Sequence, residues 1–173
     1  MYVFLTIVLV IIFVVLLTFG LAGLSGAPWV PTRRRDVARF LKLAKVKPGD
    51  KVCDLGCGDG RILLESAAIG AKAIGYEISI IPLVLVYFNR WRSPYRDQIE
   101  VKSRDFWQAD MSDVDVVFTF LVPATLGKLS RKMAKMKPGT RVINAVWPVP
   151  GWEVVEVDTE EGQAPLYLYI IDK

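Results

Sequence analysis

The first stretch of the chain is apolar almost without interruption. Residues 1–32 contain no Lys, Arg, Asp or Glu, and over the first 19 residues the only polar side chains are Thr6 and Thr18, beside the amphipathic Tyr2. A helix that crosses the hydrocarbon core of a bilayer needs about 20 apolar residues, and its backbone must form its own hydrogen bonds there. The pattern predicts one transmembrane helix over residues 1–24, which would contact the lipid bilayer.

A cleaved leader is the alternative interpretation of this segment. A signal peptide has a basic region before a short apolar run, whereas here no basic residue precedes the run and the run is longer. Small residues at positions 22–27 leave cleavage open. Pro28 and Pro31 then favour extended backbone, so residues 25–32 are predicted to form a Pro-rich connector.

Basic residues dominate the segment that follows. They stand against Asp36 alone, and the positive-inside rule therefore predicts a single-pass protein with this side of the span in the cytoplasm. The basic residues are Arg33, Arg34, Arg35, Arg39, Lys42, Lys45 and Lys47.

Residues 33–173 alternate between strand and helix patterns and are expected to form one domain. Apolar residues spaced as on one helix face, from Val37 to Ala44, predict a helix that Thr32 can cap. Further helices are expected from Gly60 to Ala68, over 80–91 with Ser79 as cap, and over 124–136. Strands are predicted at 51–55, 73–78, 99–103, 114–120, 141–146, 153–157 and 166–171.

This alternation indicates the fold class. Strands separated by helices form a parallel sheet covered on both faces, and the short turn between the last two strands favours an antiparallel end. The sequence predicts an α/β fold with a seven-stranded, mostly parallel, Rossmann-like sheet and an antiparallel final strand.

Composition excludes several kinds of chemistry. The chain has no His, which removes Ser-His-Asp and Cys-His catalysis and His-ligated metals. Its two cysteines, Cys53 and Cys57, are too few for a metal site without other ligands. The net charge of +4 is modest and partly adjacent to the apolar segment. We therefore expect no metal and no nucleic-acid partner.

A glycine-rich turn carries the strongest chemical signal. The first strand of the domain leads into Gly56-Cys57-Gly58-Asp59-Gly60, where glycines let the backbone approach a ligand. Glu77 ends the next strand, 21 residues after Gly56, and a carboxylate there can accept hydrogen bonds from ribose hydroxyls. The third glycine comes one residue too early for the nicotinamide motif, so a nicotinamide dehydrogenase is disfavoured.

The run Asp54-Leu55-Gly56-Cys57-Gly58-Asp59-Gly60 resembles the first motif of class I S-adenosylmethionine-dependent methyltransferases. The resemblance implies S-adenosyl-L-methionine as cofactor, with Asp54 orienting its methionine end. An acidic residue after the third strand commonly binds the adenine amino group in that family, and its neighbour borders the ring. The implied cofactor-binding residues are Asp54, Gly56, Cys57, Gly58, Gly60, Glu77, Asp105 and Phe106. The alternative for Asp105 is a helix N-cap.

A narrower resemblance rests on stretches between residues 27 and 152. The chain is similar to a family of small membrane-anchored methyltransferases that includes the lysine methyltransferases of mitochondrial adenine nucleotide translocase and of the ATP synthase c subunit. Leu121 departs from the Gly expected before Val-Pro. The matching stretches are Trp29-Val30-Pro31-Thr32, Gly58-Asp59-Gly60-Arg61-Ile62, Gly75-Tyr76-Glu77, Asn89-Arg90-Trp91-Arg92, Asp105-Phe106-Trp107, Phe120-Leu121-Val122-Pro123 and Trp147-Pro148-Val149-Pro150-Gly151-Trp152.

The narrower resemblance implies N-methylation of a lysine in a membrane-associated protein. A lysine amine must be neutral to accept a methyl group, and desolvation in an apolar pocket lowers its pKa from about 10.4. The candidates for such a pocket are Trp29, Phe120, Pro123 and Trp147, each of which would also suit the core. The residues name no general base. Alternatives are a lipid or quinone acceptor, a non-catalytic cofactor-binding module at the membrane, and a secreted protein if the leader is cleaved.

Overall fold

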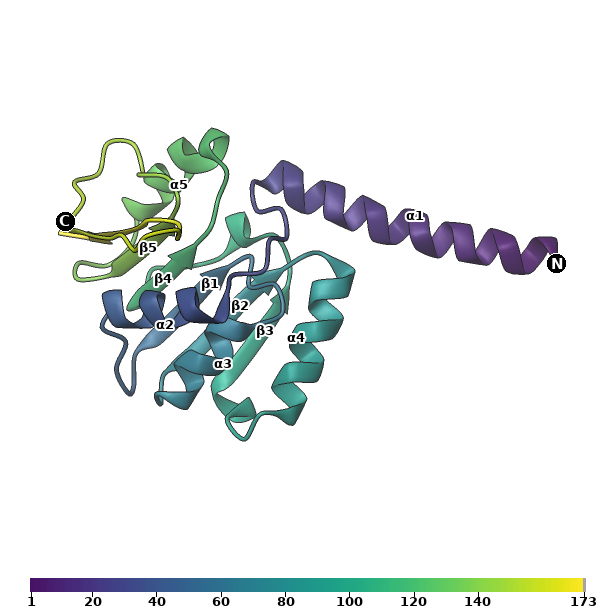
Figure 1. Ribbon diagram of the computed structural model, residues 1–173, viewed down its shortest axis with the longest axis horizontal. Helices are drawn as coiled ribbons and strands as arrows, with labels where there is room; N and C mark the ends of the chain where they lie inside the picture. Colours follow the sequence, from purple (N-terminus) through teal and green to yellow (C-terminus); the bar gives the residue numbers. More distant parts are fainter. Residues whose placement is uncertain (173) are drawn as a thin grey trace.

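A computed structural model describes residues 1–172 of the chain (Figure 1); Lys173, the last residue of the expected domain, lies outside the described residues. In chain order the elements are α1 (Tyr2–Ser25), α2 (Arg34–Leu43), β1 (Lys51–Leu55), α3 (Arg61–Ala68), β2 (Lys72–Glu77), α4 (Ile80–Arg92), the 3-10 turn η1 (Arg96–Gln98), β3 (Ile99–Ser103), η2 (Phe106–Gln108), β4 (Val116–Thr119), η3 (Pro123–Thr125), α5 (Leu126–Met133), β5 (Arg141–Ala145), β6 (Glu156–Asp158) and β7 (Leu166–Ile170).

The strands form one seven-stranded sheet in the order β3-β2-β1-β4-β5-β7-β6. The first five strands pair in parallel, and β7 runs antiparallel to both β5 and β6. The predicted fold class is thereby confirmed. The strand predicted at 153–157 begins later and is only three residues long. Because the chain steps outward from β1 to β3 and then returns to β4 on the other side of β1, the carboxyl ends of β1 and β4 flank the crevice where ligands bind in such sheets.

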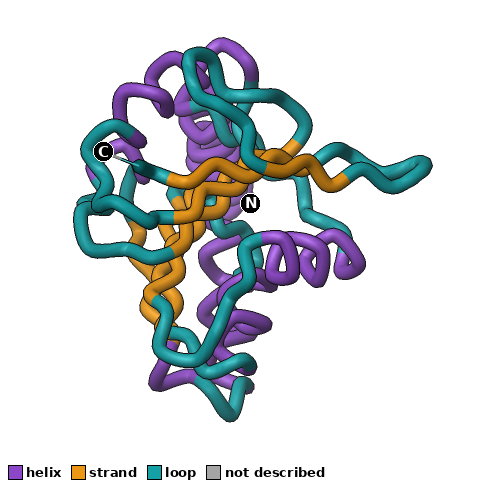
Figure 2. The backbone as a smooth tube through the Cα atoms, turned by 90° about the vertical axis from the view of Figure 1, so that its left-hand side faces the viewer, coloured by secondary structure: helices purple, strands orange, loops and turns teal. Residues whose placement is uncertain are grey.

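Helices cover both faces of the sheet (Figures 1 and 2). On one face α2 and α3 pack on β1, β4 and β5, with the ring of Phe40 edge-on to that of Phe118 at 5.3 Å between centroids, and α4 joins this side through Val86. On the other face α5 buries Leu129 and Met133. The central strands are therefore buried on both sides, as their continuous apolar sequences require.

Helix α1 projects away from the rest of the chain (Figure 1). Among residues 1–172 it is the one helix whose length and composition would allow it to cross a membrane. Its last turns contact the domain, because Ala22 is buried and the Thr18 hydroxyl accepts a hydrogen bond from Ile80 N at 3.3 Å. It ends at Ser25, the first residue of the predicted connector, and the Gly26 that follows has a φ of 97°, a conformation that favours glycine. Residues 26–33, called the connector below, lead to α2 in irregular backbone.

Two predicted helix caps are wrong. Arg33, not Thr32, occupies the N-cap position of α2, and none of the described side chains caps that helix. Ser79 does stand at the N-cap of α4, but its hydroxyl makes no hydrogen bond with the residues that the structure describes. Instead, the carboxylate of Glu77 accepts hydrogen bonds from two backbone N–H groups just before the helix, Ile78 N and Ser79 N.

Candidate active site

The glycine loop, residues 56–60 between β1 and α3, is fastened to the end of β2. Gly56 N and Cys57 N both donate to the Tyr76 carbonyl, at 3.0 and 2.9 Å. Gly56 and Gly58 have φ values of 87° and 57°, in the left-handed region where glycine is favoured. The loop therefore presents backbone, with little side chain, at the crevice beyond β1.

Glu77 lies beside this loop at the end of β2. It is only 6% exposed, and three backbone N–H groups hold its carboxylate. Gly58 N donates to Oε2 at 3.0 Å, while Ile78 N and Ser79 N donate to Oε1 at 2.8 Å each. A carboxylate has about four acceptor positions, so Glu77 keeps capacity for a hydroxyl donor from a ligand.

Asp54, near the end of β1, faces the same cavity and is 5% exposed. Burial, reinforced by the negative charges of Glu77 and Asp59, raises the pKa of Asp54 to about 8. Removing a carboxylate from water disfavours its charged form, and nearby negative charges add to the effect. A positively charged ligand group in the cavity would have the opposite effect, which makes this end of the cavity suited to a cation.

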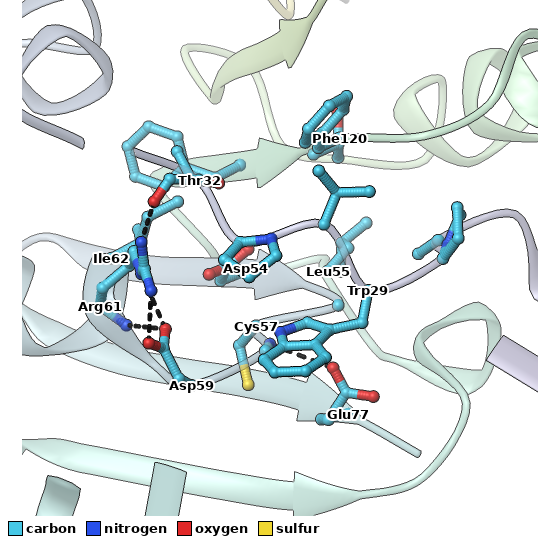
Figure 3. A pocket seen from close by; sticks show the side chains of 18 of the residues that line it. Trp29, Thr32, Asp54, Leu55, Cys57, Asp59, Arg61, Ile62, Glu77 and Phe120 are labelled. Carbon is cyan, nitrogen blue, oxygen red and sulfur yellow. Dashed lines mark hydrogen bonds and ion pairs between the residues drawn. The ribbon is translucent and has the colours of Figure 1, made fainter. Parts of the chain in front are cut away.

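The cavity has two walls of different origin (Figure 3). β1, the glycine loop and Glu77 form one wall, and the connector, through Ala27–Thr32, forms the other. The space between the walls, counted with its open mouth, is about 580 Å³. Sequence reasoning named one residue of the connector, Trp29, as a pocket candidate and missed that the connector as a whole forms this wall.

Trp29, predicted as an acceptor-pocket residue, lies directly on the glycine loop and lines the main cavity. A Cβ built on Gly58 would stand 3.0 Å from Trp29 Nε1, and the indole ring lies tilted by 33° to the ring of Phe19, at 6.0 Å between centroids. Its buried Nε1 has no hydrogen-bond partner among residues 1–172. Buried N–H groups are normally paired, so this one marks a position where a ligand acceptor is expected.

Arg61 ties the two walls together. Its guanidinium pairs with Asp59 of the glycine loop, with Nη2 at 2.6 Å from Oδ2 and Nε at 2.8 Å from Oδ1. Its Nη1 donates to the Thr32 carbonyl of the connector, as Figure 3 shows. The paired charges lower the pKa of Asp59 against the opposing effect of burial. The bridge fixes the connector over the mouth of the crevice.

Asp105 and Phe106 begin the short helix η2 after β3. Asp105 Oδ1 accepts from Trp107 N at 2.9 Å, which makes it an N-cap, and Oδ2 accepts from the Ser25 hydroxyl at 3.3 Å. Phe106 lines a smaller cavity that shares Ala27 and Gly56 with the main one. The structure thus brings Phe106 to the site and holds Asp105 against the end of α1.

An apolar cleft of about 300 Å³ opens next to the cavity. Three of the four residues predicted for an acceptor pocket line it, namely Phe120, Pro123 and Trp147, while Trp29 does not. Phe120 lines both the cleft and the main cavity. A reacting group in the cleft and a ligand in the cavity would therefore both lie next to Phe120.

Buried polar contacts hold the Trp147 end of the cleft. Asn144 Nδ2 donates to the Trp147 carbonyl at 2.6 Å, and the Thr119 hydroxyl donates to Asn144 Oδ1. Between them Val146 has a φ of 72°, a strained conformation for a β-branched residue that is concentrated at functional sites. Sequence reasoning missed Asn144 and Thr119; a polar residue inside an otherwise apolar strand was the available signal.

Comparisons with known proteins decide the family. Residues 54–156 match the family described as ANTKMT methyltransferase domain. The chain belongs to this family. It is 35% identical over 150 residues to a protein-lysine N-methyltransferase of Saccharolobus islandicus, and the match covers 83% of this chain and 93% of the relative.

Relatives from animals share the same region of the enzyme. Adenine nucleotide translocase lysine N-methyltransferase of Mus musculus is 33% identical over 144 residues, and the lysine N-methyltransferase of the ATP synthase c subunit from Rattus norvegicus is 30% identical over 145 residues. Each match covers 82% of this chain. The chain spans 62% and 65% of the lengths of these two relatives.

A solved structure agrees with the family assignment. The RNA methyltransferase of Salinibacter ruber in complex with S-adenosyl-L-homocysteine has a TM-score of 0.79 and 31% identity to this methyltransferase. The match covers 83% of this chain and 95% of that one. The enzyme is therefore an S-adenosylmethionine-dependent methyltransferase, as its sequence resemblance implied.

The residues of the main cavity fit this cofactor. S-adenosylmethionine combines ribose hydroxyls, which donate hydrogen bonds, with a positively charged sulfonium. The anchored carboxylate of Glu77 suits the hydroxyls, the buried carboxyl of Asp54 with the negative charges of Glu77 and Asp59 near it suits a cation, and the Trp29 N–H, without a partner among the described residues, suits an acceptor atom. The glycine loop leaves backbone room for a close approach.

Proposed function

We propose that this methyltransferase transfers the methyl group of S-adenosylmethionine to the ε-amino group of a lysine in a membrane protein, close to the cytoplasmic surface. One observation carries the proposal: the segment that leaves the apolar helix α1 is itself a wall of the cofactor cavity. If α1 spans the bilayer, the reaction is confined within a few residues of it. Such confinement raises the effective concentration of a membrane target without added contacts.

The wall formed by the sheet is assigned to cofactor binding. Glu77 accepts hydrogen bonds from the ribose hydroxyls, and Asp54 faces the positively charged methionine end. Backbone of the glycine loop, including Gly56, Cys57, Gly58 and Gly60, borders the cofactor. Phe106 borders the adenine ring from the smaller cavity. Asp105 reaches the adenine amino group through the oxygen that now accepts from Ser25.

When bound, the cofactor would supply a methyl group on a sulfonium sulfur: the neutral amine nitrogen would bond the methyl carbon, the electron pair of the broken carbon–sulfur bond would stay on sulfur, and the proton of the new ammonium would go to water. The apolar cleft prepares that amine. Desolvation among Phe120, Pro123 and Trp147 lowers the pKa of an entering lysine below its usual value of about 10.4. Phe120, which lines both spaces, sets the approach, and orientation of this kind supplies much of the rate.

The membrane topology is part of the proposal. Helix α1 is proposed to be an uncleaved anchor, and the basic residues after it favour a cytoplasmic domain. Arg39 is not available to lipid headgroups, because it is buried in ion pairs with Asp158 at 2.6 Å and Asp36 at 3.1 Å. The other six basic residues still outnumber the acidic ones. The animal relatives are named as lysine methyltransferases of a translocase and of an ATP synthase subunit. These names support a membrane-protein target.

Labelling with S-adenosylmethionine carrying a radioactive methyl group tests the acceptor. The full chain is reconstituted into the same vesicles as the detergent-extracted membrane proteins and lipids of the source cells. Label in a membrane protein that yields N-methyl-lysine after acid hydrolysis is the expected result, and Glu77→Ala serves as the inactive control. Label that partitions with lipid or quinone, or that is released by ribonuclease, would overturn the lysine proposal.

A second variant tests the role of the anchor while keeping the cavity wall intact. Residues 2–17 are replaced by a helical sequence rich in Ala, Glu and Lys, and residues 18–33 are left unchanged. This variant should methylate a short soluble lysine peptide as fast as the full enzyme does. It should be slower on the target embedded in vesicles, and equal rates on that target would contradict confinement by the anchor.

A further inference from the structure

The outward face of α4 is apolar. Helix geometry places Ile81, Val84, Phe88 and Trp91 on one side of the helix, and all four are exposed, Val84 by 62% and Trp91 by 68%. Leu85 and Tyr87 extend this face on either side. Pro82 and Val86 form the opposite, buried face. This helix thus has apolar residues on the side that faces the sheet and on the side that does not.

Helix α5 provides the internal comparison. It packs on the opposite side of the sheet through Leu129 and Met133, and its outward positions carry Lys128 and Arg131, with Lys135 in the turn that follows. An amphipathic helix facing water normally has this pattern. The apolar outward face of α4 is therefore not a general property of the helices in this domain. Contiguous exposed apolar patches commonly mark an interaction surface.

Helix α1 shows which partner covers the face. The two helices are in contact, through the hydrogen bond from Ile80 N to the Thr18 hydroxyl. In Figure 1 α4 lies on the side of the domain from which α1 projects and runs crosswise to it. A bilayer crossed by α1 would therefore extend alongside α4, parallel to the helix and facing its apolar side.

The length of α1 determines how deep in the bilayer the start of α4 would lie. Residues 2–17, before the contact with α4, give about 24 Å of helix at about 1.5 Å per residue. The hydrocarbon core is about 30 Å thick, so the span must continue past Thr18 to about Leu21. The first turn of α4, bonded to Thr18, is thereby brought to the boundary between acyl chains and headgroups.

The polar residues of α4 suit that boundary. The helix contains no Asp or Glu, and its last turn carries Arg92 beside the outward face, whereas Arg90 points to the domain and donates to the Ile99 carbonyl at 2.7 Å. The guanidinium of Arg92 lies 5.5 Å from the ring centroid of Phe88. Tryptophan is enriched at membrane interfaces, and an Arg next to apolar residues can reach lipid phosphates while its stem stays among them.

We propose that the outward face of α4, formed by Ile81, Val84, Leu85, Phe88 and Trp91, lies in the interface of the phospholipid bilayer. This second contact rests on the proposed membrane span of α1. It fixes the rotation of the domain about α1, which a single helix does not. The cavity and cleft are then presented to the membrane surface in one orientation.

Single nitroxide labels on the full chain in vesicles of phosphatidylcholine and phosphatidylglycerol test the proposal. Cys53 and Cys57 are buried and burial raises the pKa of both thiols, so introduced cysteines are labelled selectively. Labels are placed by Leu9→Cys in α1, Val84→Cys in α4 and Arg131→Cys in α5. Collisions with oxygen, which is enriched in lipid, and with a water-soluble nickel complex report the surroundings.

The proposal expects Leu9→Cys deep in lipid, Val84→Cys in lipid at a shallow depth and Arg131→Cys in water. Leu9 in lipid with Val84 in water would overturn the α4 contact and leave the anchor standing. Both in water would overturn the anchor itself. A Val84 label shielded from both reagents would show that protein, such as a second copy of the chain, covers the face, and would also overturn the proposal.

A charged variant of the same face gives a functional readout. Val84→Glu with Phe88→Glu should leave methylation of a short soluble peptide unchanged, because neither residue lines the cavity or the cleft. Methylation of the target in vesicles should fall by about threefold or more, since the domain loses its fixed orientation. Arg131→Glu in α5 is the matched control and should change neither rate; equal behaviour of the α4 and α5 variants on vesicles would contradict the proposal.

Discussion

The two walls of the cofactor cavity are held in different ways. The sheet wall is fixed by hydrogen bonds between the ends of the adjacent strands β1 and β2: the glycine loop donates to the Tyr76 carbonyl, and Glu77 accepts from three N–H groups. The connector wall depends on isolated contacts between distant parts of the chain. Val122 N donates to the Gly26 carbonyl at 2.9 Å, Trp107 Nε1 donates to the Ser25 carbonyl at 2.8 Å, and Arg61 donates to Thr32.

The difference shows how the proposed anchor and the cofactor site are connected. The sheet wall would keep its shape without α1, because its hydrogen bonds lie within the domain. The connector wall would not, because the chain between Ser25 and α2 is positioned partly by where α1 ends. Regions with few contacts open at lower free energy than the core. We therefore infer that the sheet wall supplies most of the cofactor affinity and that the connector wall closes over it.

Glu77→Ala is expected to have the largest effect. It removes a charged acceptor from the sheet wall, and hydrogen bonds to charged groups contribute about 1.5–3 kcal/mol, or roughly ten- to hundredfold in Kd. Titration calorimetry of S-adenosylmethionine binding measures this, and circular dichroism checks that the variant folds. Glu77→Gln keeps the size of the side chain and should lose less affinity. A folded Glu77→Ala variant with normal affinity would exclude the ribose role.

Gly58→Ala tests the contact between the walls. Its Cβ would stand 3.0 Å from Trp29 Nε1, so the connector must move outward and cofactor affinity should fall by about 1–2 kcal/mol, as for other overpacked sites. Gly49→Ala is the matched control: its φ of 86° carries similar strain, but none of the described residues lies within 4 Å of the added Cβ. It should lower the melting temperature without changing affinity.

The combination of Gly58→Ala with Trp29→Ala sharpens this test. The second substitution removes the group that Gly58→Ala displaces, so the loss in the double variant should be smaller than the sum of the two single losses. Additive losses would show that Gly58 and Trp29 act on the cofactor independently and that the walls are not coupled there.

The pH dependence of binding tests Asp54. Because burial raises the pKa of this group to about 8, Asp54 stabilises the cofactor-free fold when protonated, and this contribution is lost as pH rises from about 4 through 8. A cationic cofactor favours the charged form, so affinity should increase as pH rises towards 8. Asp54→Asn should flatten that increase. Equal pH profiles for both proteins would remove Asp54 from the methionine end.

The sequence predicted the sheet wall well, for physical reasons that can be stated. Gly56, Gly58 and Glu77 belong to local patterns of strand, turn and helix, and the alternation of elements fixes where their strands end. Asp105 shows the limit: the same position suits an adenine contact and a helix cap, and the structure shows the cap and a bond to Ser25, 80 residues away.

The connector wall was not predictable in the same way. Its position depends on long-range contacts, such as Arg61 with Thr32 and Trp107 with Ser25, that leave no periodic signal in the sequence. The two failed helix caps have a similar cause. The carbonyl of Thr32 is held by Arg61, and the amides at the start of α4 are served by Glu77, so site contacts replaced the local capping that composition suggested.

Trp29→Phe should give the smallest effect, and it should be larger on cofactor affinity than on stability. The substitution keeps a ring against Phe19 but removes both the Nε1 donor, which lacks a partner among residues 1–172, and the volume of the second indole ring. Because removing an unpaired buried donor, which costs about 1–3 kcal/mol, offsets the packing lost with the smaller ring, the melting temperature of the cofactor-free variant should change little. Cofactor affinity should fall by about 0.5–1.5 kcal/mol if the N–H binds the cofactor. A loss of both stability and affinity would instead mean that Trp29 acts by packing alone, and that the connector wall contributes shape but no hydrogen bond to the site.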